Sequence, residues 1–232
     1  MICAIHQPQY LPWLGYFEKI HRSDVFILLD NVQFKKNEWQ NRNKICTPNP
    51  PGWQWLTVPV LHDFGQNINE VQLNPAVAWA GEHVRAIEMN YARAPYFKEI
   101  WPALRPLYDA TWPNLAALNS AFVQKIVAIL GIKTRLVTAS SLAVSTTKTE
   151  RLVDLCRAVG CDTYLAGAGC AEYMDFELFK ASGITVEVQL YTHPVYPQVW
   201  AHTPEAFMPH MSVIDLLFNA GKDSLKILAE RA

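Results

Sequence analysis

The chain has 232 residues, of which 50% are hydrophobic, and a formal net charge of −1, so it can form one domain with a substantial core and has no global basic field for nucleic acid. It opens without a signal-peptide pattern, contains no apolar run of the roughly 20 residues that span a bilayer, and spaces its five cysteines too irregularly for a disulfide framework. We therefore expect a single domain, residues 1–232, that is cytoplasmic, keeps its thiols reduced, is not inserted in a membrane and binds no nucleic acid.

The first 44 residues predict a strand, a helix and a second strand, with polar residues where each strand ends. An apolar strand at residues 2–5 runs into a turn, a helix follows from Trp13 to about His21, and residues 25–29 form the second strand. In a parallel sheet, ligands bind outside the carboxyl ends of the strands. We therefore expect one crevice with His6 and Asp30 as catalytic residues and with four substrate contacts, namely Gln7, Tyr10, Trp13 and Gln33.

His6 is the first candidate for a general base. Pro8 and Pro12 make the turn that follows it rigid, and a fixed position lowers the reorganisation cost of proton transfer. An Asp30 carboxylate beside the ring would fix one tautomer. Alternatives stay open for both side chains, because His6 can simply hydrogen-bond the turn and Asp30 can bind a substrate amine or cap a turn.

A basic cluster follows the second strand. Four cations are interleaved with asparagines between residues 35 and 44, and both arginine and lysine bind phosphate. The alternative is a run of solvated surface charges. We predict that the cluster holds a diphosphate or the phosphates of coenzyme A through Lys36, Asn41, Arg42, Asn43 and Lys44.

The middle of the chain changes from strands to helices. Residues 54–60 and 68–73 are rich in β-branched and aromatic residues, which predicts an antiparallel excursion from the sheet. From residue 75 to 131 the apolar residues recur at three- and four-residue spacing, and this predicts about three helices. These helices either form an insert or flank the sheet. The expected ranges are 79–91, 95–108 and 113–130.

Strands and helices alternate again after residue 131. Strands at residues 135–138, 163–165 and 184–190 are separated by helical patterns, which predicts a second parallel α/β run. The chain is therefore expected to be an α/β protein with a mainly parallel sheet flanked by helices and a helical segment near residues 75–131.

A glycine-rich turn follows the strand at residues 163–165. Its sequence is Ala-Gly-Ala-Gly, and small residues there let the backbone approach an anion. It is neither a full dinucleotide fingerprint nor a P-loop. Its candidate substrate-binding residues are Gly167, Gly169 and Tyr173.

A second His/Gln/Tyr/Pro turn begins at His193. Its sequence His-Pro-Val-Tyr-Pro-Gln echoes the His-Gln-Pro-Gln-Tyr that starts at His6, and the two turns could face each other across the sheet. His193 is thus a second catalytic candidate, with Tyr196 and Gln198 as substrate contacts. A purely structural turn is the alternative.

Other chemistries have little support. The Cys-x-x-Cys and His-Glu-x-x-His spacings are absent, so we expect no metal site. Gly-x-Ser-x-Gly is absent as well, which leaves a serine hydrolase without its motif. Cys170, at a predicted helix N-terminus, is the best thiol candidate but has no further support.

Long motifs in the chain resemble the WbqC-like family. The most specific is His6-Gln-Pro-Gln-Tyr-Leu-Pro-Trp-Leu-Gly-Tyr-Phe-Glu-Lys19, and shorter matches are Asp30-Asn-Val-Gln33, Asn41-Arg-Asn-Lys44 and Ser212-Val-Ile-Asp215. The resemblance implies an N-acyl or aminoacyl transferase, of a glycyl type, that acts on a nucleotide-activated amino sugar in O-antigen or other bacterial surface-polysaccharide biosynthesis. It also implies an acyl thioester co-substrate, carried by coenzyme A or an acyl carrier protein, and no tightly bound cofactor.

A weaker likeness concerns the fold alone. The opening strand, His-containing turn, helix and strand resemble the start of pantothenate synthetase and related HUP-type adenylate-forming enzymes, without their paired histidines. This keeps open an adenylating or nucleotidyl-transferring enzyme that uses ATP and magnesium. A binding module without catalysis is the further alternative, and the oligomeric state is not defined by the sequence.

Overall fold

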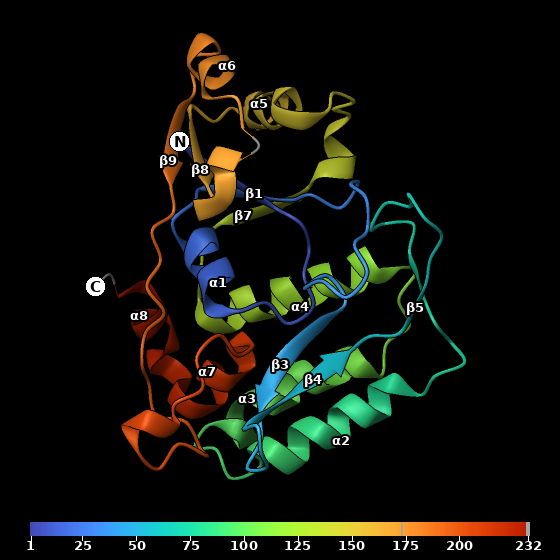
Figure 1. Cartoon of the computed structure of the whole chain (residues 1–232), viewed down its shortest axis with the longest axis vertical. Helices are drawn as coiled ribbons and strands as arrows, with labels where there is room; N and C mark the ends of the chain where they lie inside the picture. The colour runs from blue at the N-terminus through green and yellow to red at the C-terminus, as the bar shows by residue number, and fades with distance from the viewer. Residues whose placement is uncertain (173, 231–232) are drawn as a thin grey trace.

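The centre of the protein is a five-stranded sheet with the order β7–β2–β1–β8–β9 (Figure 1). The structure is a computed structural model that describes residues 1–172 and 174–230. Every strand pair in this sheet is parallel, so the predicted α/β class with a mainly parallel sheet is confirmed. The strands are β1 (Ile2–His6), β2 (Val25–Leu28), β7 (Arg135–Thr138), β8 (Thr163–Ala166) and β9 (Thr185–Val188).

The central strands are apolar because both of their faces are covered. In β1, Ala4 faces a large core that includes Phe26, whereas Cys3 and Ile5 face a smaller core that includes Ile27. A parallel strand buried on both faces shows a continuous apolar run rather than an alternation. Helices α1 (Leu14–His21) and α4 (Leu115–Leu130) lie on the side of the large core, and α5 (Lys148–Ala158) and α6 (Phe176–Ala181) lie on the other side (Figure 1).

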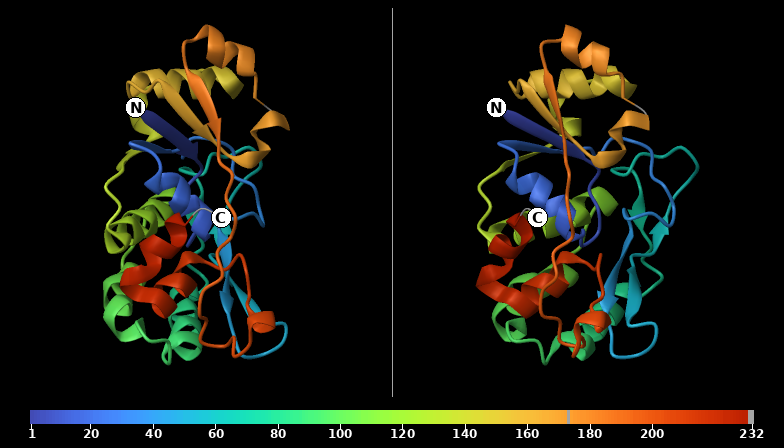
Figure 2. Two further views of the ribbon diagram at one scale, coloured as in Figure 1. Left: turned by 90° about the vertical axis from the view of Figure 1, so that its left-hand side faces the viewer. Right: turned by 60° about the vertical axis from the view of Figure 1, so that its left-hand side comes forward.

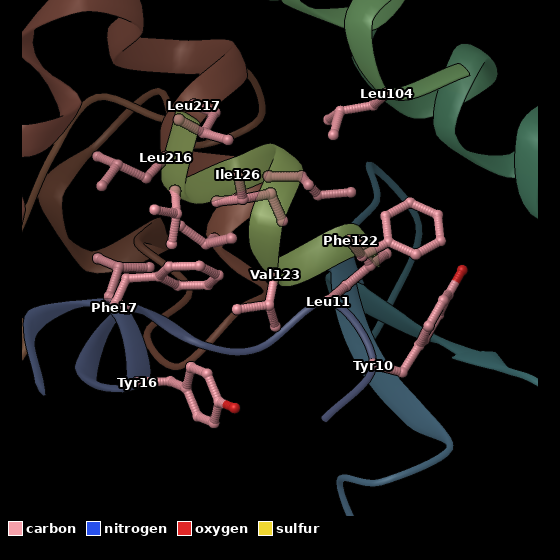
Figure 3. Close-up of a cluster of buried hydrophobic side chains, with 14 of the residues drawn as sticks. Tyr10, Leu11, Tyr16, Phe17, Leu104, Phe122, Val123, Ile126, Leu216 and Leu217 are labelled. Carbon is pink, nitrogen blue, oxygen red and sulfur yellow. The ribbon is translucent and has the colours of Figure 1, made fainter. Parts of the chain in front are cut away.

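Residues 75–131 flank the sheet as part of the large core. Helices α2 (Trp79–Tyr91) and α3 (Phe97–Leu104) form a layer below α4, together with α7 (Val213–Ala220) and α8 (Ser224–Ala229). Figure 3 shows Val123 and Ile126 of α4 between side chains of α1 and α7, and Phe122 beside Tyr10 and Leu11 of the turn that precedes α1. Among the described residues, no helix combines the length and the apolar character needed to cross a membrane.

Two antiparallel hairpins interrupt the long connection between β2 and β7. The first pairs β3 (Arg42–Cys46) with β4 (Trp53–Thr57), and the second pairs β5 (Val60–Leu61) with β6 (Gln72–Leu73). The predicted antiparallel excursion is therefore present. The strand β3, which the sequence pattern does not predict, brings the basic cluster into the first hairpin.

The strand order reverses at β1. Its neighbour β2 follows it in the chain and lies on one side, while β8 lies on its other side. This is the arrangement of a Rossmann-type or HUP-like sheet, in which ligands bind at the switch point between the two directions. Here the switch point lies between the ends of β1 and β8.

A long segment returns from the sheet edge to the helical layer. This strap, residues 189–212, runs from β9 down to α7 (Figure 2). At one end Gln189 Nε2 donates to the Gly15 carbonyl at 2.8 Å, and at the other end the Ser212 N–H donates to the Lys44 carbonyl at 2.9 Å. The strap therefore connects α1, the first hairpin and α7.

Candidate functional site

Two adjoining cavities open at the carboxyl ends of β1 and β8. Their volumes are about 350 and 320 Å³, and both are lined by His6, Lys19 and Gly167. We refer to them together as the switch-point crevice. The first is also lined by Trp13, Gly15, Tyr16, Ala168, Gly169, Gln189 and Tyr191, and the second by Ile5, Gln7, Leu29, Leu152 and Tyr164.

The His6 ring is held in one orientation at the end of β1. Its Nδ1 lies 3.2 Å from the Gln7 carbonyl oxygen, and the ring packs edge-on against Tyr16 at 4.9 Å between centroids. A proton on Nδ1 donates to that carbonyl and leaves the Nε2 lone pair free. Burial, followed by the charge of Lys19, lowers the pKa of His6 to about 3. The imidazole is therefore neutral at pH 7, with an unprotonated Nε2.

Lys19 places a buried ammonium group in the same crevice. Lys19 is 3% exposed, and its Nζ donates to the Ile5 carbonyl at 3.2 Å. Burial lowers the pKa of Lys19 to about 8, so the amine is still mostly protonated at pH 7. Within the described residues Lys19 forms no salt bridge, and the carboxylate of the neighbouring Glu18 instead accepts from Gln189 and pairs with Arg22. An ammonium with donors to spare is a binding group for an anion.

The glycine-rich turn after β8 forms the facing wall. A Cβ atom added to Gly167 would lie 4.0 Å from Lys19 Nζ, and one added to Gly169 would meet nothing within 4 Å. The turn therefore leaves room for a ligand to approach its backbone. Phosphate groups commonly bind where backbone N–H groups and a lysine converge.

The turn between β1 and α1 is fixed by β3 and α7 as well as by its prolines. Leu11 has a φ of 44°, which is strained for a residue with a side chain, and its carbonyl accepts from Asn43 Nδ2 at 2.7 Å. The Val213 N–H donates to the Pro12 carbonyl at 2.9 Å. These bonds set the position of Trp13 at the mouth of the crevice.

Part of the predicted site is brought together in this crevice. Its lining includes five of the predicted site residues, namely His6, Gln7, Trp13, Gly167 and Gly169. The Gln7 side-chain oxygen accepts from Gln40 Nε2 at 2.9 Å. Tyr173 lies outside the described residues.

Asp30 does not approach the His6 ring. Its carboxylate accepts the Ser140 N–H at 2.9 Å and the Ser140 hydroxyl at 2.6 Å. Ser140 belongs to the 3₁₀ turn that follows β7. Asp30 therefore caps this turn, as the alternative interpretation of the sequence allowed, and the structure supplies no contact through which it would orient His6.

Three predicted substrate contacts are buried in the packing of the molecule. The Tyr10 hydroxyl lies 2.8 Å from His83 Nδ1 and 2.9 Å from the Tyr108 hydroxyl. Tyr196 and Gln198 donate to the Asp215 carboxylate at 2.9 and 2.7 Å. None of the three lines the crevice, because each is used to join one segment of the chain to another.

His193 has both ring nitrogens occupied within the strap. Its Nε2 accepts from the His210 N–H at 3.1 Å, and its Nδ1 lies 2.9 Å from the Pro194 carbonyl oxygen. Burial lowers the pKa of His193 to about 4. Of the two predicted bases, only His6 therefore combines a free nitrogen with a place in the crevice.

The predicted basic cluster is divided among three environments. Gln33 and Lys36 are exposed in the loop after β2. Asn41 and Asn43 are buried and donate to the Val58 and Leu11 carbonyls. Arg42 and Lys44 lie on the outer face of the first hairpin, where they stack on tryptophan rings. The structure thus places Arg42 and Lys44 outside the switch-point crevice.

Lys19 and Tyr191 are crevice residues that the sequence pattern does not predict. Lys19 lies on a short helix, where a lysine is usually solvated. Tyr191 comes from the strap, and its ring contacts Trp13 at 5.5 Å between centroids. Burial raises the pKa of Tyr191, and its hydroxyl has no hydrogen-bond partner among the described residues. It can therefore donate to a ligand in the crevice.

The described residues offer a site for an anion rather than a ready set of metal ligands. No group of three or more His, Cys, Asp or Glu side chains in residues 1–172 and 174–230 is placed to hold a metal ion. The crevice instead combines one ammonium group, one neutral imidazole and a glycine-rich turn. This set can bind a phosphate and accept a proton.

Comparisons with known proteins agree with the sequence motifs. The chain is 38% identical to the uncharacterized protein Rv1507c of Mycobacterium tuberculosis (strain ATCC 25618 / H37Rv) over 225 residues, which cover 95% of this chain and 94% of the relative. No solved structure matches the chain significantly. The model of the WbqC-like protein family matches residues 7–227, a range that includes nearly all of the crevice. The chain therefore belongs to the WbqC-like protein family.

Proposed function

We propose that the protein is a transferase that moves an acyl or aminoacyl group, of a glycyl type, from a thioester to the amine of a nucleotide-activated amino sugar. The observation that carries this proposal is the pairing of a buried ammonium group, Lys19, with a neutral His6 ring in one crevice at the switch point. Membership of the WbqC-like family is consistent with a role in O-antigen or other surface-polysaccharide biosynthesis.

Each group in the crevice has a task in this reaction. Lys19 and the backbone of residues 167–169 would hold the phosphates of the nucleotide sugar. The sugar amine attacks the thioester carbonyl carbon, a C–N bond forms and the C–S bond breaks. His6 Nε2 accepts the proton of the amine and returns it to the departing sulfur. The co-substrate is an acyl group on coenzyme A or on an acyl carrier protein.

The oxyanion that forms at the carbonyl needs a hydrogen-bond donor. Gln7 lines the second cavity, and its side-chain NH₂ group is available because its oxygen is the atom bonded to Gln40. Gln33 and Asn43, two other amides among the predicted substrate contacts, cannot take this role, because Gln33 is exposed and Asn43 donates to the Leu11 carbonyl. Gln7 is therefore the donor that we assign to this role.

Phosphate binding would also strengthen the base. The charge of Lys19 contributes to the low pKa of His6. An anion bound to Lys19 offsets this charge, so the pKa of His6 rises when the nucleotide sugar is in place. Proton acceptance is thereby favoured in the loaded enzyme.

The test is to incubate the protein with a nucleotide-linked 4-amino sugar and an acyl thioester, and to measure free thiol and amide product. His6→Ala should lower turnover by about 10²–10⁴-fold, since a positioned base contributes roughly that much. Its affinity for the nucleotide sugar should stay close to that of the wild type. A folded variant with a normal rate would remove His6 from the reaction.

An adenylating or nucleotidyl-transferring enzyme is the second candidate, and the strand order favours it. The sheet has the reversal at β1 that is typical of nucleotide-binding folds. Such an enzyme would release pyrophosphate from ATP and magnesium in the presence of a carboxylic acid, without any thioester. Pyrophosphate release without thiol release would support this second candidate and contradict the acyltransferase proposal. Neither product, together with tight binding of the sugar nucleotide, would indicate a non-catalytic binding module.

A further inference from the structure

An aromatic cavity adjoins the switch-point crevice. It has a volume of about 280 Å³ and is lined by Trp13, Trp39 and His210. Trp13 also lines the first cavity of the crevice. Trp13 is therefore a wall that the two spaces share.

The rings of this aromatic cavity are held by three separate parts of the chain. Trp13 precedes α1 and packs on Gly15, where an added Cβ atom would come within 2.5 Å of the indole. His210 comes from the strap, and its ring lies 5.9 Å from that of Trp13. Trp39 precedes β3, lies 5.6 Å from the Trp55 ring and keeps 39% of its surface exposed. The cavity is thus assembled by the fold from residues far apart in the sequence.

Two cations lie on the indoles next to the aromatic cavity. The Arg42 guanidinium is 4.3 Å from the centroid of Trp55, and Lys44 Nζ is 4.0 Å from that of Trp53. Within the described residues neither forms a salt bridge, and Arg42 Nε is buried with no hydrogen-bond partner. Their charge disfavours a cationic ligand and is compatible with a neutral ring that belongs to an anionic molecule.

We propose that the aromatic cavity binds the base of the nucleotide whose phosphates lie against Lys19. The proposal rests on the nucleotide-linked substrate of the proposed function and assigns the subsite that recognises it. Flat ring faces with few hydrogen-bonding groups suit a planar heterocycle, whereas a hexose needs partners for its hydroxyls. The substrate then runs from the base at Trp39, past Trp13, to the phosphates in the crevice.

The test measures affinity by calorimetry for UMP and AMP, pyrophosphate and glucose 1-phosphate. Trp39→Ala should weaken the binding of at least one nucleotide by about 5- to 140-fold, since one stacked base contributes roughly that much. It should leave pyrophosphate affinity unchanged. The control is Phe64→Ala, which removes a ring that is 98% exposed and lies outside the cavity, and it should bind every probe normally.

The outcomes separate this proposal from the proposed function. Unchanged nucleotide affinity in Trp39→Ala overturns the base subsite, whereas loss of pyrophosphate and nucleotide binding in Lys19→Met still supports the crevice. A Trp39→Ala effect on glucose 1-phosphate but not on nucleotides assigns the cavity to a sugar and also overturns the proposal. A wild-type protein that binds none of the probes removes both proposals together.

Discussion

The buried position of Lys19 is costly for folding, and the proposed function uses the charge of Lys19 to bind an anion. A buried ammonium group that lacks a carboxylate partner is destabilising, because it loses hydration without a full replacement. Its lowered pKa expresses the same cost, since the folded protein releases this proton near pH 8 and the unfolded chain only near 10.5. The crevice therefore holds a charge that a bound anion can stabilise.

Replacing Lys19 by methionine should stabilise the protein at pH 7 by up to ~3 kcal/mol, because each unit of pKa shift corresponds to about 1.4 kcal/mol. The wild type binds fewer protons when folded than when unfolded between pH 8 and 10.5, so its own stability rises across that range. The gain from Lys19→Met should accordingly shrink by pH 10. Urea unfolding at both pH values measures this.

Lys36→Met is the matched control, since Lys36 is exposed and its replacement should leave the free energy of unfolding within about 0.5 kcal/mol. A Lys19→Met protein that is less stable than the wild type at pH 7 would show that the ammonium group is well compensated in the unliganded protein. Lys19 would then be a structural residue.

At the scale of elements, the local pattern of apolar residues in the sequence predicts the strands of the main sheet and the helices α2 and α4. β1, β2 and β8 are short apolar runs, and the apolar residues of α4 recur at helical spacing. The sequence pattern does not predict β3. Its buried face carries the polar Asn43 as well as Ile45, so the alternation of polar and apolar residues that marks a strand is absent. The sequence Arg-Asn-Lys thus resembles a charged loop although it is half of a hairpin.

The site residues that could be predicted are likewise those that the local sequence pattern places at the ends of strands. His6 and Gly167 come directly after strands, so the parallel sheet alone brings them to one edge. Lys19 lies in α1, where every residue from Leu14 to Ile20 is buried. The sequence predicts the helix itself, but a helix that carries Glu18 and Lys19 is expected to expose its charged residues, so the burial of Lys19 could not be predicted.

Gly15 is required by the contact between α1 and Trp13. In Gly15→Ala the new methyl group would meet the indole at 2.4 Å, so Trp13 has to move. We expect a loss of about 1–3 kcal/mol in the free energy of unfolding, as for other overpacked sites, and weaker binding of nucleotide and pyrophosphate. Denaturant unfolding and calorimetry check the two effects.

Gly81→Ala in α2 is the control for Gly15→Ala. A Cβ atom there meets nothing within 4 Å, so the change should stabilise the protein by about 0.5–1 kcal/mol and leave binding intact. Equal behaviour of the two alanine variants would show that Trp13 tolerates displacement and does not shape the crevice.

At the scale of the whole molecule, Asp215 joins segments that are distant in the chain. Its carboxylate, which is fully buried, accepts from Tyr91 of α2 and from Tyr196 and Gln198 of the strap. The Tyr91 hydroxyl in turn accepts the Cys46 N–H of β3. Such long-range contacts also decide where Asp30, Arg42 and His193 lie. Local sequence does not contain this information, so it could not predict that these three residues lie outside the crevice.

Removing this carboxylate should loosen the strap. Asp215→Ala leaves two hydroxyls and one amide buried without their acceptor, and each such group costs about 1–3 kcal/mol. We expect the free energy of unfolding to fall by about 3 kcal/mol or more in urea titrations. Asp109→Ala, which removes an exposed partner of Arg105, should cost less than about 1 kcal/mol. Similar losses in both variants would contradict the central role of Asp215.

The position of β1 between β2 and β8 has a consequence for biosynthesis. As the nascent chain leaves the ribosome, β1 emerges well before β8, so one of its edges stays open until residues 163–165 have been made. The crevice then still lacks Tyr191, and the neighbouring aromatic cavity lacks His210. The unpaired, apolar edge of β1 is therefore exposed until β8 has been made. We expect a chaperone to be most needed during this interval, because an exposed strand edge can aggregate.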